Sequence, residues 1–300
     1  MEDGAPHDAG DDSVPEQWAE HRRYLFAVAY RLLGTAADAE DAVQEAFTRL
    51  RAAPAGLSNP RAWLTTVTSR VCLDMLGSAR ARRETYAGTW LPEPLAGYDD
   101  TDLGDIAALR ESVRTAVLLV LESLTPAERV AFVLHDVFGM DFDRVATVTG
   151  RTPQACRQLA SRARRRVRAE APPRAPVSAE EHRRVSEVFL RAAADGDLTE
   201  LVALLDPGVV LRSDGGGAVP AARVDVHGRD RVMTLLSGLT RRYGGFLPSP
   251  VVLAGGPGFV LHLDGTVLGV VGIEMSGGRI TVLDFVVNPA KLTGVRSWRS

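Results

Sequence analysis

The first part of the chain carries apolar residues at three- and four-residue spacing, the period of an amphipathic α-helix. A glycine at position 34 ends the first stripe, and Thr35 can cap the next helix, whose acidic first turn suits the positive end of the helix dipole. A loop over 54–60 precedes a third stripe. The pattern predicts a helical domain over residues 17–85, with helices at 18–33, 35–50 and 61–78.

Residues 86–105 contain prolines, glycines and acids without a helical period, which is typical of a linker. Helical periodicity returns at about Ile106. Thr125, Pro126 and Glu128 then supply an N-cap, a first-turn proline and an acidic third position. A short helix and a turn at Gly150 follow before a last helix, so residues 106–170 form a second predicted helical domain.

The composition changes after a proline-rich linker at 171–178. Two helices and then β-branched runs predict an α+β domain over 179–292 with a curved antiparallel sheet, followed by a tail at 293–300. The expected strands are 209–213, 251–253, 259–263, 267–274 and 280–287, and a helix is expected near 229–239.

The composition is that of a globular chain with several domains: 300 residues, 45% hydrophobic and 24% charged. Disorder throughout, a collagen-like fibre and a coiled-coil rod are thereby excluded. The two cysteines form no disulfide framework and no zinc spacing, so we expect no metal, no cofactor and a reducing, cytoplasmic location. Residues 1–16 read as a disordered acidic tail, and no apolar run is long enough to span a membrane.

The formal net charge of −3 is a sum over segments of opposite sign. Residues 151–168 carry many arginines and no acid, and they coincide with the last helix of a helix–turn–helix pattern. Such a helix enters the major groove of DNA, where arginine and glutamine can bond base edges and further arginines reach phosphates. Of the 35 lysine and arginine residues only Lys291 is a lysine, a bias that we attribute to a GC-rich genome.

Three runs resemble domains 2 and 4 of the extracytoplasmic-function sigma factors, bacterial subunits that direct RNA polymerase to promoters. They are RLLGTAADAEDAVQEAF at 31–47, NPRAWL at 59–64 and LTPAERVAF at 124–132. WLPEP at 90–94, DGGG at 214–217 and NPAKL at 288–292 are similar to motifs of the subgroup with a fused SnoaL-like domain. The resemblance covers the chain from Trp18 to Leu292.

The resemblance implies two surfaces in domain 2. The helix over 37–50 would dock on the clamp helices of core RNA polymerase, and the loop and helix that follow would open the promoter −10 element, where unstacked bases and the displaced backbone must be held. The residues assigned to polymerase are Asp38, Asp41, Gln44 and Glu45, and those assigned to the −10 element are Ser58, Asn59, Arg61, Arg70, Arg80, Arg82 and Arg83.

In domain 4, the resemblance implies a recognition helix for the −35 element. Its residues are Arg151, Thr152, Gln154, Arg157, Gln158, Arg162 and Arg165. The fused domain would act as a regulator in cis, in place of a separate membrane-bound anti-sigma factor, by holding the linker and the sigma domains. The residues assigned to that role are Trp90, Leu91, Pro92, Glu93, Pro94, Asp214, Gly215, Gly216, Gly217, Asn288, Pro289 and Lys291.

Two other functions stay open for the whole chain. One is a helix–turn–helix regulator that senses a small ligand in the SnoaL-like cone and binds duplex operators without polymerase. The other is a cyclase or isomerase with an attached DNA-binding region, for which an Asp–His pair would move protons. The candidates for such a pair are Asp214, His227, His262 and Asp284, but we expect Asp214 to bond its own glycine-rich turn and expect no catalytic residue here.

Overall fold

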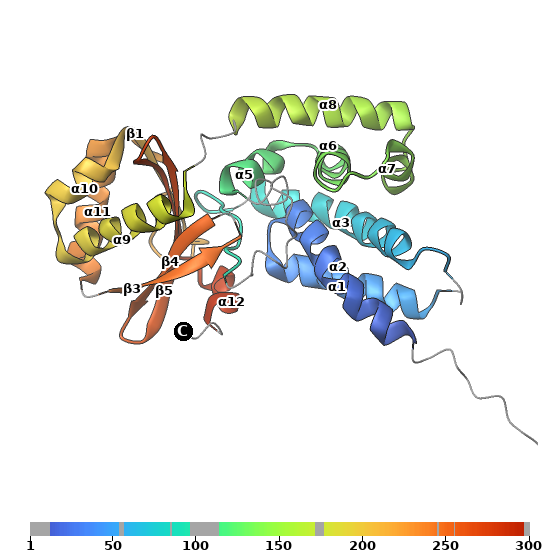
Figure 1. Cartoon of the computed structure of the whole chain (residues 1–300), viewed down its shortest axis with the longest axis horizontal. Helices are drawn as coiled ribbons and strands as arrows, with labels where there is room; N and C mark the ends of the chain where they lie inside the picture. Colours follow the sequence, from blue (N-terminus) through green and yellow to red (C-terminus); the bar gives the residue numbers. More distant parts are fainter. Residues whose placement is uncertain are drawn as a thin grey trace, which may run out of the picture. The chain divides into compact units, whose positions relative to one another are not determined.

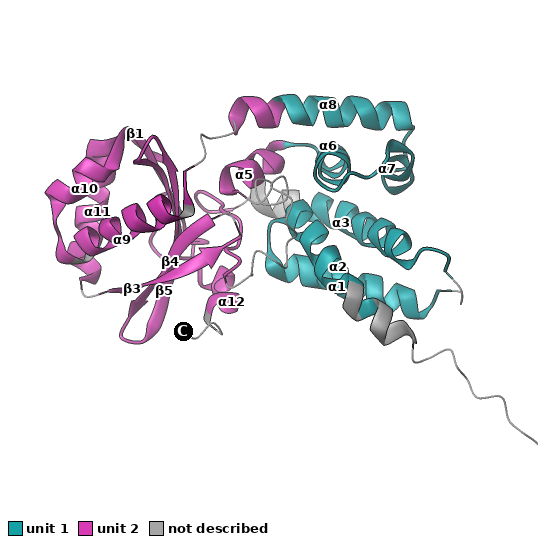
Figure 2. Cartoon of the chain, in the orientation of Figure 1, with its two compact units in different colours: residues 1–79, 124–165 teal, residues 80–123, 166–300 magenta. Residues whose placement is uncertain are grey.

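The computed structural model describes residues 13–53, 57–84, 86–96, 114–171, 177–244, 246–254 and 256–296. Most of the predicted acidic tail, the start of the helix expected at Ile106 and most of the proline-rich linker lie outside these ranges. The chain divides into two compact units (Figure 2), one formed by residues 1–79 and 124–165 and the other by residues 80–123 and 166–300. The segment expected to link two helical domains therefore belongs to the unit of the C-terminal domain. The three-domain division stays a prediction.

Unit 1 is helical, and the last residues of two of its helices, α3 and α8, are assigned to unit 2. Its elements are α1 (Ser13–Leu33), α2 (Ala36–Arg51), α3 (Pro60–Glu84), α6 (Pro126–Phe132), the π-helical turn η1 (Val133–Val137), α7 (Phe142–Thr149) and α8 (Pro153–Glu170). Thr125 caps α6 in a reciprocal pair with Glu128, as the sequence predicts. Gly150 ends α7 in the left-handed conformation at a φ of 65°.

Unit 2 contains one mixed sheet of six strands in the order β2-β1-β6-β5-β4-β3. Its elements are α5 (Thr115–Ser123), α9 (Ala179–Asp195), α10 (Leu198–Leu204), β1 (Leu205–Asp214), β2 (Val226–His227), α11 (Arg229–Tyr243), β3 (Leu247–Leu253), β4 (Gly256–Leu263), β5 (Thr266–Ser276), β6 (Arg279–Val286), the 3-10 turn η2 (Pro289–Lys291) and α12 (Thr293–Arg296). The expected strands are present. All pairs are antiparallel except β1 with β6, which run parallel; the long connection through α11 and β3–β5 allows this pairing.

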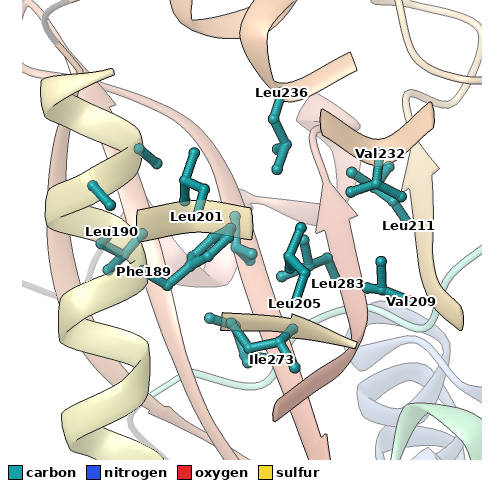
Figure 3. Packing of buried hydrophobic residues seen from close by; sticks show 14 of the residues in the cluster. Phe189, Leu190, Leu201, Leu205, Val209, Leu211, Val232, Leu236, Ile273 and Leu283 are labelled. Atoms are coloured by element: carbon teal, nitrogen blue, oxygen red, sulfur yellow. The ribbon is translucent and has the colours of Figure 1, made fainter. Parts of the chain in front are cut away.

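Both faces of this sheet are covered. On one face lie α9, α10 and α11 (Figure 1), which pack against alternate strand residues. Figure 3 shows Phe189, Leu201 and Leu236 of these helices close to Leu205 and Leu283 of the sheet. The other face buries a smaller apolar cluster to which the linker, α5 and α12 contribute: Leu91, Leu119, Leu292 and Val295. The linker is thus part of the structure of the C-terminal domain.

Candidate functional site

The helix–turn–helix in unit 1 presents one side of α8 to solvent. Its inner side buries Cys156, Leu159, Ala160 and Ala163 against the rest of the unit. All seven residues predicted to read the −35 element are exposed: Arg151, Thr152, Gln154, Arg157, Gln158, Arg162 and Arg165. Five side chains on this side, including three arginines, line a shallow hollow: Arg157, Gln158, Ser161, Arg162 and Arg165. The arrangement gives a cationic surface with hydrogen-bond donors at the start of the helix.

Two arginines of α8 already have partners within unit 1. The Nε atom of Arg162 donates to Glu128 at 2.9 Å, and that of Arg164 donates to Asp136 at 2.5 Å. Arg157 lies over the ring of Phe142, with 5.4 Å from its guanidinium carbon to the ring centroid. These contacts restrict the conformations of the three arginine side chains, so the surface is preorganised for binding.

The predicted −10 residues have mixed surroundings. Ser58, Asn59, Arg61 and Arg70 are exposed. The Asn59 side chain caps α3 by accepting from Ala62 N–H at 2.9 Å, and Arg61 lies 4.2 Å from the ring centroid of Tyr24. Arg80, Arg82 and Arg83 belong to the last turns of α3, but their side chains lie outside the described part of the structure.

Two of the residues predicted to dock on polymerase make side-chain contacts at or within α2. Asp38 is half-buried, and its carboxylate accepts from the Thr35 hydroxyl at 2.7 Å at the start of the helix. Asp41, Gln44 and Glu45 are exposed, and Glu45 pairs with Arg49 one turn later at 2.8 Å. An anionic surface is therefore present, although Asp38 mainly stabilises the helix end.

The segments expected to form domains 2 and 4 contact each other inside unit 1 through arginines that bond main-chain carbonyls. Arg129 of α6 is buried and donates to the Leu32 carbonyl at the end of α1 at 2.9 Å, and burial lowers the pKa of its guanidinium to about 9. Arg70 of α3 donates to the Thr147 carbonyl of α7 at 2.8 Å. Arg70, which is predicted to bind the −10 element, is thus hydrogen-bonded to the helix–turn–helix.

The second site is a buried polar cluster in unit 2, which we call the linker clasp: Tyr86, Trp90, Leu91, Asp214, Asn288 and Lys291. Asp214 lies at its centre, with no exposed side-chain surface. Lys291 donates to its Oδ2 atom at 2.7 Å, and Leu91 N–H donates to the same atom at 2.9 Å. The Tyr86 hydroxyl donates to Oδ1 at 2.5 Å. The carboxylate is therefore fully bonded, as a buried charge must be.

Lys291 is held on several sides. Its ammonium donates to the Leu91 carbonyl as well as to Asp214, and it lies 4.3 Å from the ring centroid of Trp90 and 5.2 Å from that of Tyr86. A compact ammonium with separate donors suits these positions better than a planar guanidinium does. The only lysine of the chain thus lies in this cluster, at a position that arginine would fit less well.

Asn288 and Tyr86 close the cluster on the side of the glycine turn. Asn288 donates from its amide to the Tyr86 hydroxyl at 2.8 Å, and its carbonyl oxygen caps η2 by accepting from Ala290 N–H at 3.1 Å. Burial, together with the hydrogen bond to Asp214, raises the pKa of Tyr86 above its usual range, so its hydroxyl remains a donor at neutral pH. Asp214 also accepts from Gly216 N–H at 3.0 Å, as expected for an aspartate that opens a turn.

The clasp continues along the linker. Thr89 donates to the Asp225 side chain at 3.1 Å, the Leu95 carbonyl accepts from Ala254 N–H at 3.1 Å, and Ala96 forms a bridge with Leu253. Leu91, Pro92 and Glu93 are buried, whereas Trp90 and Pro94 are half-buried. The structure therefore brings together the WLPEP linker, the glycine turn and the NPAKL segment that the sequence singled out.

One residue of the clasp was missed by sequence reasoning. Tyr86 stands in an aperiodic segment, 128 positions from its partner Asp214, and no local pattern marks it. Lys291 was assigned to this site through the resemblance, but its pairing with Asp214 was not predicted, although a lone lysine in an arginine-rich chain indicates a position where the two cations are not interchangeable.

Gly216 offers a test of the glycine turn. It has a φ of +62°, and a Cβ atom there would overlap the Asn288 side chain. We expect Gly216→Ala to cost the left-handed penalty of about 1–2 kcal/mol and a further loss from displacing Asn288. Gly265→Ala is the matched control, because its φ is +75° but nothing lies within 4 Å of the added atom. Thermal unfolding of both variants measures the difference, and equal losses would contradict the contact.

The candidates for proton-transfer chemistry are not brought together. Asp284 is bound by Arg212 through two hydrogen bonds of 2.6 and 3.1 Å, and burial raises the pKa of Asp284 to about 6 against the opposite effect of Arg212. Asp214 is fully used in the clasp, His227 is exposed on β2, and His262 lies half-buried on β4. Within the described ranges none of the four lines the apolar cavity of the domain.

Comparison with known proteins identifies two regions that match family models, and relatives that match over most of the chain. The models of Sigma-70 region 2 and Sigma-70 region 4 match residues 18–82 and 114–167. The chain is 43% identical over 287 residues to the ECF RNA polymerase sigma factor SigJ of Mycobacterium tuberculosis, covering 91% of each chain. It is 38% identical over 296 residues to the probable ECF RNA polymerase sigma factor SigI of the same species, covering 95% of this chain and 97% of the relative.

A solved structure agrees with these matches. The crystal structure of Mycobacterium tuberculosis SigJ superposes with a TM-score of 0.74 at 41% sequence identity, over 94% of this chain and 98% of that one. In the part of the chain that the structure describes, no helix has the length and apolar character needed to cross a membrane.

Proposed function

Because the chain belongs to the extracytoplasmic-function (ECF) RNA polymerase sigma factors and so directs polymerase to promoters, we propose that its SnoaL-like C-terminal domain regulates this activity in cis through the linker clasp. The observation that carries the proposal is the buried pair of Asp214 and Lys291, which binds both the N–H and the carbonyl of Leu91. The pair therefore ties the linker directly to the C-terminal domain.

The clasp bears on initiation because the linker joins the two promoter-reading regions. A free chain can extend to at most ~3.3–3.6 Å per residue, so holding residues 86–96 on the C-terminal domain prevents this part of the linker from extending. The clasp thereby limits how far regions 2 and 4 can separate on a promoter.

The other partner surfaces follow from the exposed residues. We assign core polymerase to the side of α2 with Asp41, Gln44 and Glu45, and assign the −35 element to the exposed side of α8. We assign the −10 element to the first half of α3, including Arg70 once its bond to the Thr147 carbonyl is released. This assignment makes the contacts between Arg129, Arg70 and their carbonyl partners a second restraint in the free protein.

The proposal places the protein in the cytoplasm, gives the C-terminal domain no catalytic role and requires no separate membrane anti-sigma factor. Asp214 and Asp284 support the second point, because both carboxylates are bonded to cations that hold the structure. The matches to regions 2 and 4 favour a polymerase subunit over the operator-binding regulator and over the cyclase.

A transcription assay tests the proposal. In holoenzyme reconstituted with core polymerase, Lys291→Met should raise promoter-directed transcript output several-fold at limiting protein, because the linker is freed. Arg279→Met, an exposed cation of the same domain, should leave the output unchanged. An output that is equal to that of the wild type, or lower, would show that the clasp does not restrain initiation.

A further inference from the structure

The C-terminal domain contains an apolar cavity of about 170 Å³ between α9, α11 and the sheet. Phe189, Leu236, Phe246, Val271 and Phe285 are among its lining side chains, and Phe189 and Leu236 are visible in the packed region of Figure 3. No described residue that lines it is charged. The Thr240 hydroxyl is already directed to the carbonyls of Leu236 and Ala193, and Tyr243 is the other lining residue with a polar side-chain group. The lining is therefore mainly apolar.

The size and lining define the ligand that would fit. An engineered apolar cavity of about 150 Å³ in another protein stays dry and binds benzene. A charged ligand would lose its hydration here without gaining a partner, which costs several kcal/mol. The chemistry therefore selects an uncharged, mainly apolar molecule that is at least as large as one six-membered ring.

The walls of the cavity are continuous with the linker clasp. Val219 and Pro220, which line it, follow the glycine turn, and the Val219 N–H donates to the Gly215 carbonyl at 3.2 Å. On the other side, Phe285 and Val287 line it and directly precede Asn288. The Val287 N–H donates to the Asp214 carbonyl at 2.9 Å. Both segments that hold Asp214 and Asn288 in place thus also form the cavity.

We propose that this cavity binds an uncharged, mainly apolar small molecule and that its occupancy favours the closed linker clasp. The inference rests on the proposed regulation in cis and adds the class of signal to which it responds. A ligand that fills the cavity stabilises both wall segments, and it therefore binds the closed arrangement more tightly than an open one. By linkage, it must then shift the clasp toward the closed state.

The test uses p-xylene as the probe and Lys291 as the reporter. Calorimetric titration of the full chain should show binding of p-xylene, and Ala193→Phe, which fills the cavity from α9, should weaken it by at least about tenfold. Val202→Phe on the exposed side of α10 is the matched control and should bind as the wild type does. If Ala193→Phe does not fold, Leu239→Trp fills the cavity from α11.

The second measurement reads the clasp directly. Lys291 carries the only side-chain amine of the protein, so its acetylation by an N-hydroxysuccinimide ester, followed by mass spectrometry, reports clasp opening. At ten times its dissociation constant, p-xylene should slow this reaction by up to about tenfold. The slowing should be lost in Ala193→Phe and kept in Val202→Phe.

The outcomes separate the two ideas. Absence of p-xylene binding, or binding that the cavity-filling variants leave intact, would overturn the site. Binding with an unchanged acetylation rate would overturn the coupling to the clasp. Neither readout involves polymerase, so a failure of Lys291→Met to alter transcription would contradict the regulatory function while leaving a positive cavity result in place.

Discussion

Asp214→Ala should lower the free energy of unfolding of the C-terminal domain by about 3–5 kcal/mol, the usual cost of removing one member of a buried ion pair. The Lys291 ammonium would remain buried without its carboxylate, and the N–H groups of Leu91 and Gly216 would lose their acceptor. The linker segment 86–96 should become the first part of the domain to open. Hydrogen exchange of peptides from this segment, measured in the full chain, reports both effects.

Two further variants make this result specific. Asp225→Ala removes the exposed contact to Thr89 and a weak electrostatic interaction with Arg212, and it should cost less than about 1 kcal/mol. The double variant Asp214→Asn, Lys291→Met replaces both charges by neutral groups of similar volume, and it should recover much of the loss while leaving the linker more weakly held. If Asp214→Ala cost no more than Asp225→Ala, the buried pair would not be the basis of the clasp.

The second large effect is expected on α8. Arg157→Ala should cost the holoenzyme about 1–3 kcal/mol of discrimination between the cognate −35 element and a scrambled one, because a bidentate contact to a base edge would be lost. Arg168→Ala, further along the same helix, should instead weaken binding to both duplexes alike and reduce the slope of log affinity against log salt by about 1. Both residues are exposed, so neither change should disturb the fold.

Fluorescence anisotropy with the two duplexes over a series of salt concentrations measures these quantities. Arg157 lies over the Phe142 ring, which orients its guanidinium without taking up its donors, and this supports its choice as the base reader. If Arg157→Ala weakened binding to cognate and scrambled DNA equally, Arg157 would be a phosphate contact, and base reading would fall to Gln154 or Gln158.

The helices and strands could be predicted because each depends on its own residues. The capping pair of Thr125 and Glu128 and the left-handed Gly150 are local signals, and the structure confirms both. The β-branched runs likewise mark the strands, except β2, whose two residues are too short for a pattern. The third helix runs to Glu84, beyond the predicted end at Ser78, because arginine and alanine in the extra turn are good helix formers.

The clasp could be predicted only in part. Its three segments were known as motifs through the resemblance to a family, but no local rule pairs Asp214 with Lys291, which is 77 positions away. The pairing depends on β1 and β6 being parallel neighbours, and strand order is a property of the whole sheet. The roles of Asp284 and Arg212 were missed for the same reason, since those residues meet across that pair.

The parallel pairing of β1 and β6 also bears on how the sheet finds its alignment. Both strands end at the same edge, with Asp214 opposite Val286, just before Asn288. A slip of β6 by one residue would move Asn288 and Lys291 by about 3.3 Å and turn the side chains of β6 to the opposite face. The buried carboxylate would then have no cation. A charge pair at the end of two central strands therefore favours one alignment during folding and penalises its neighbours.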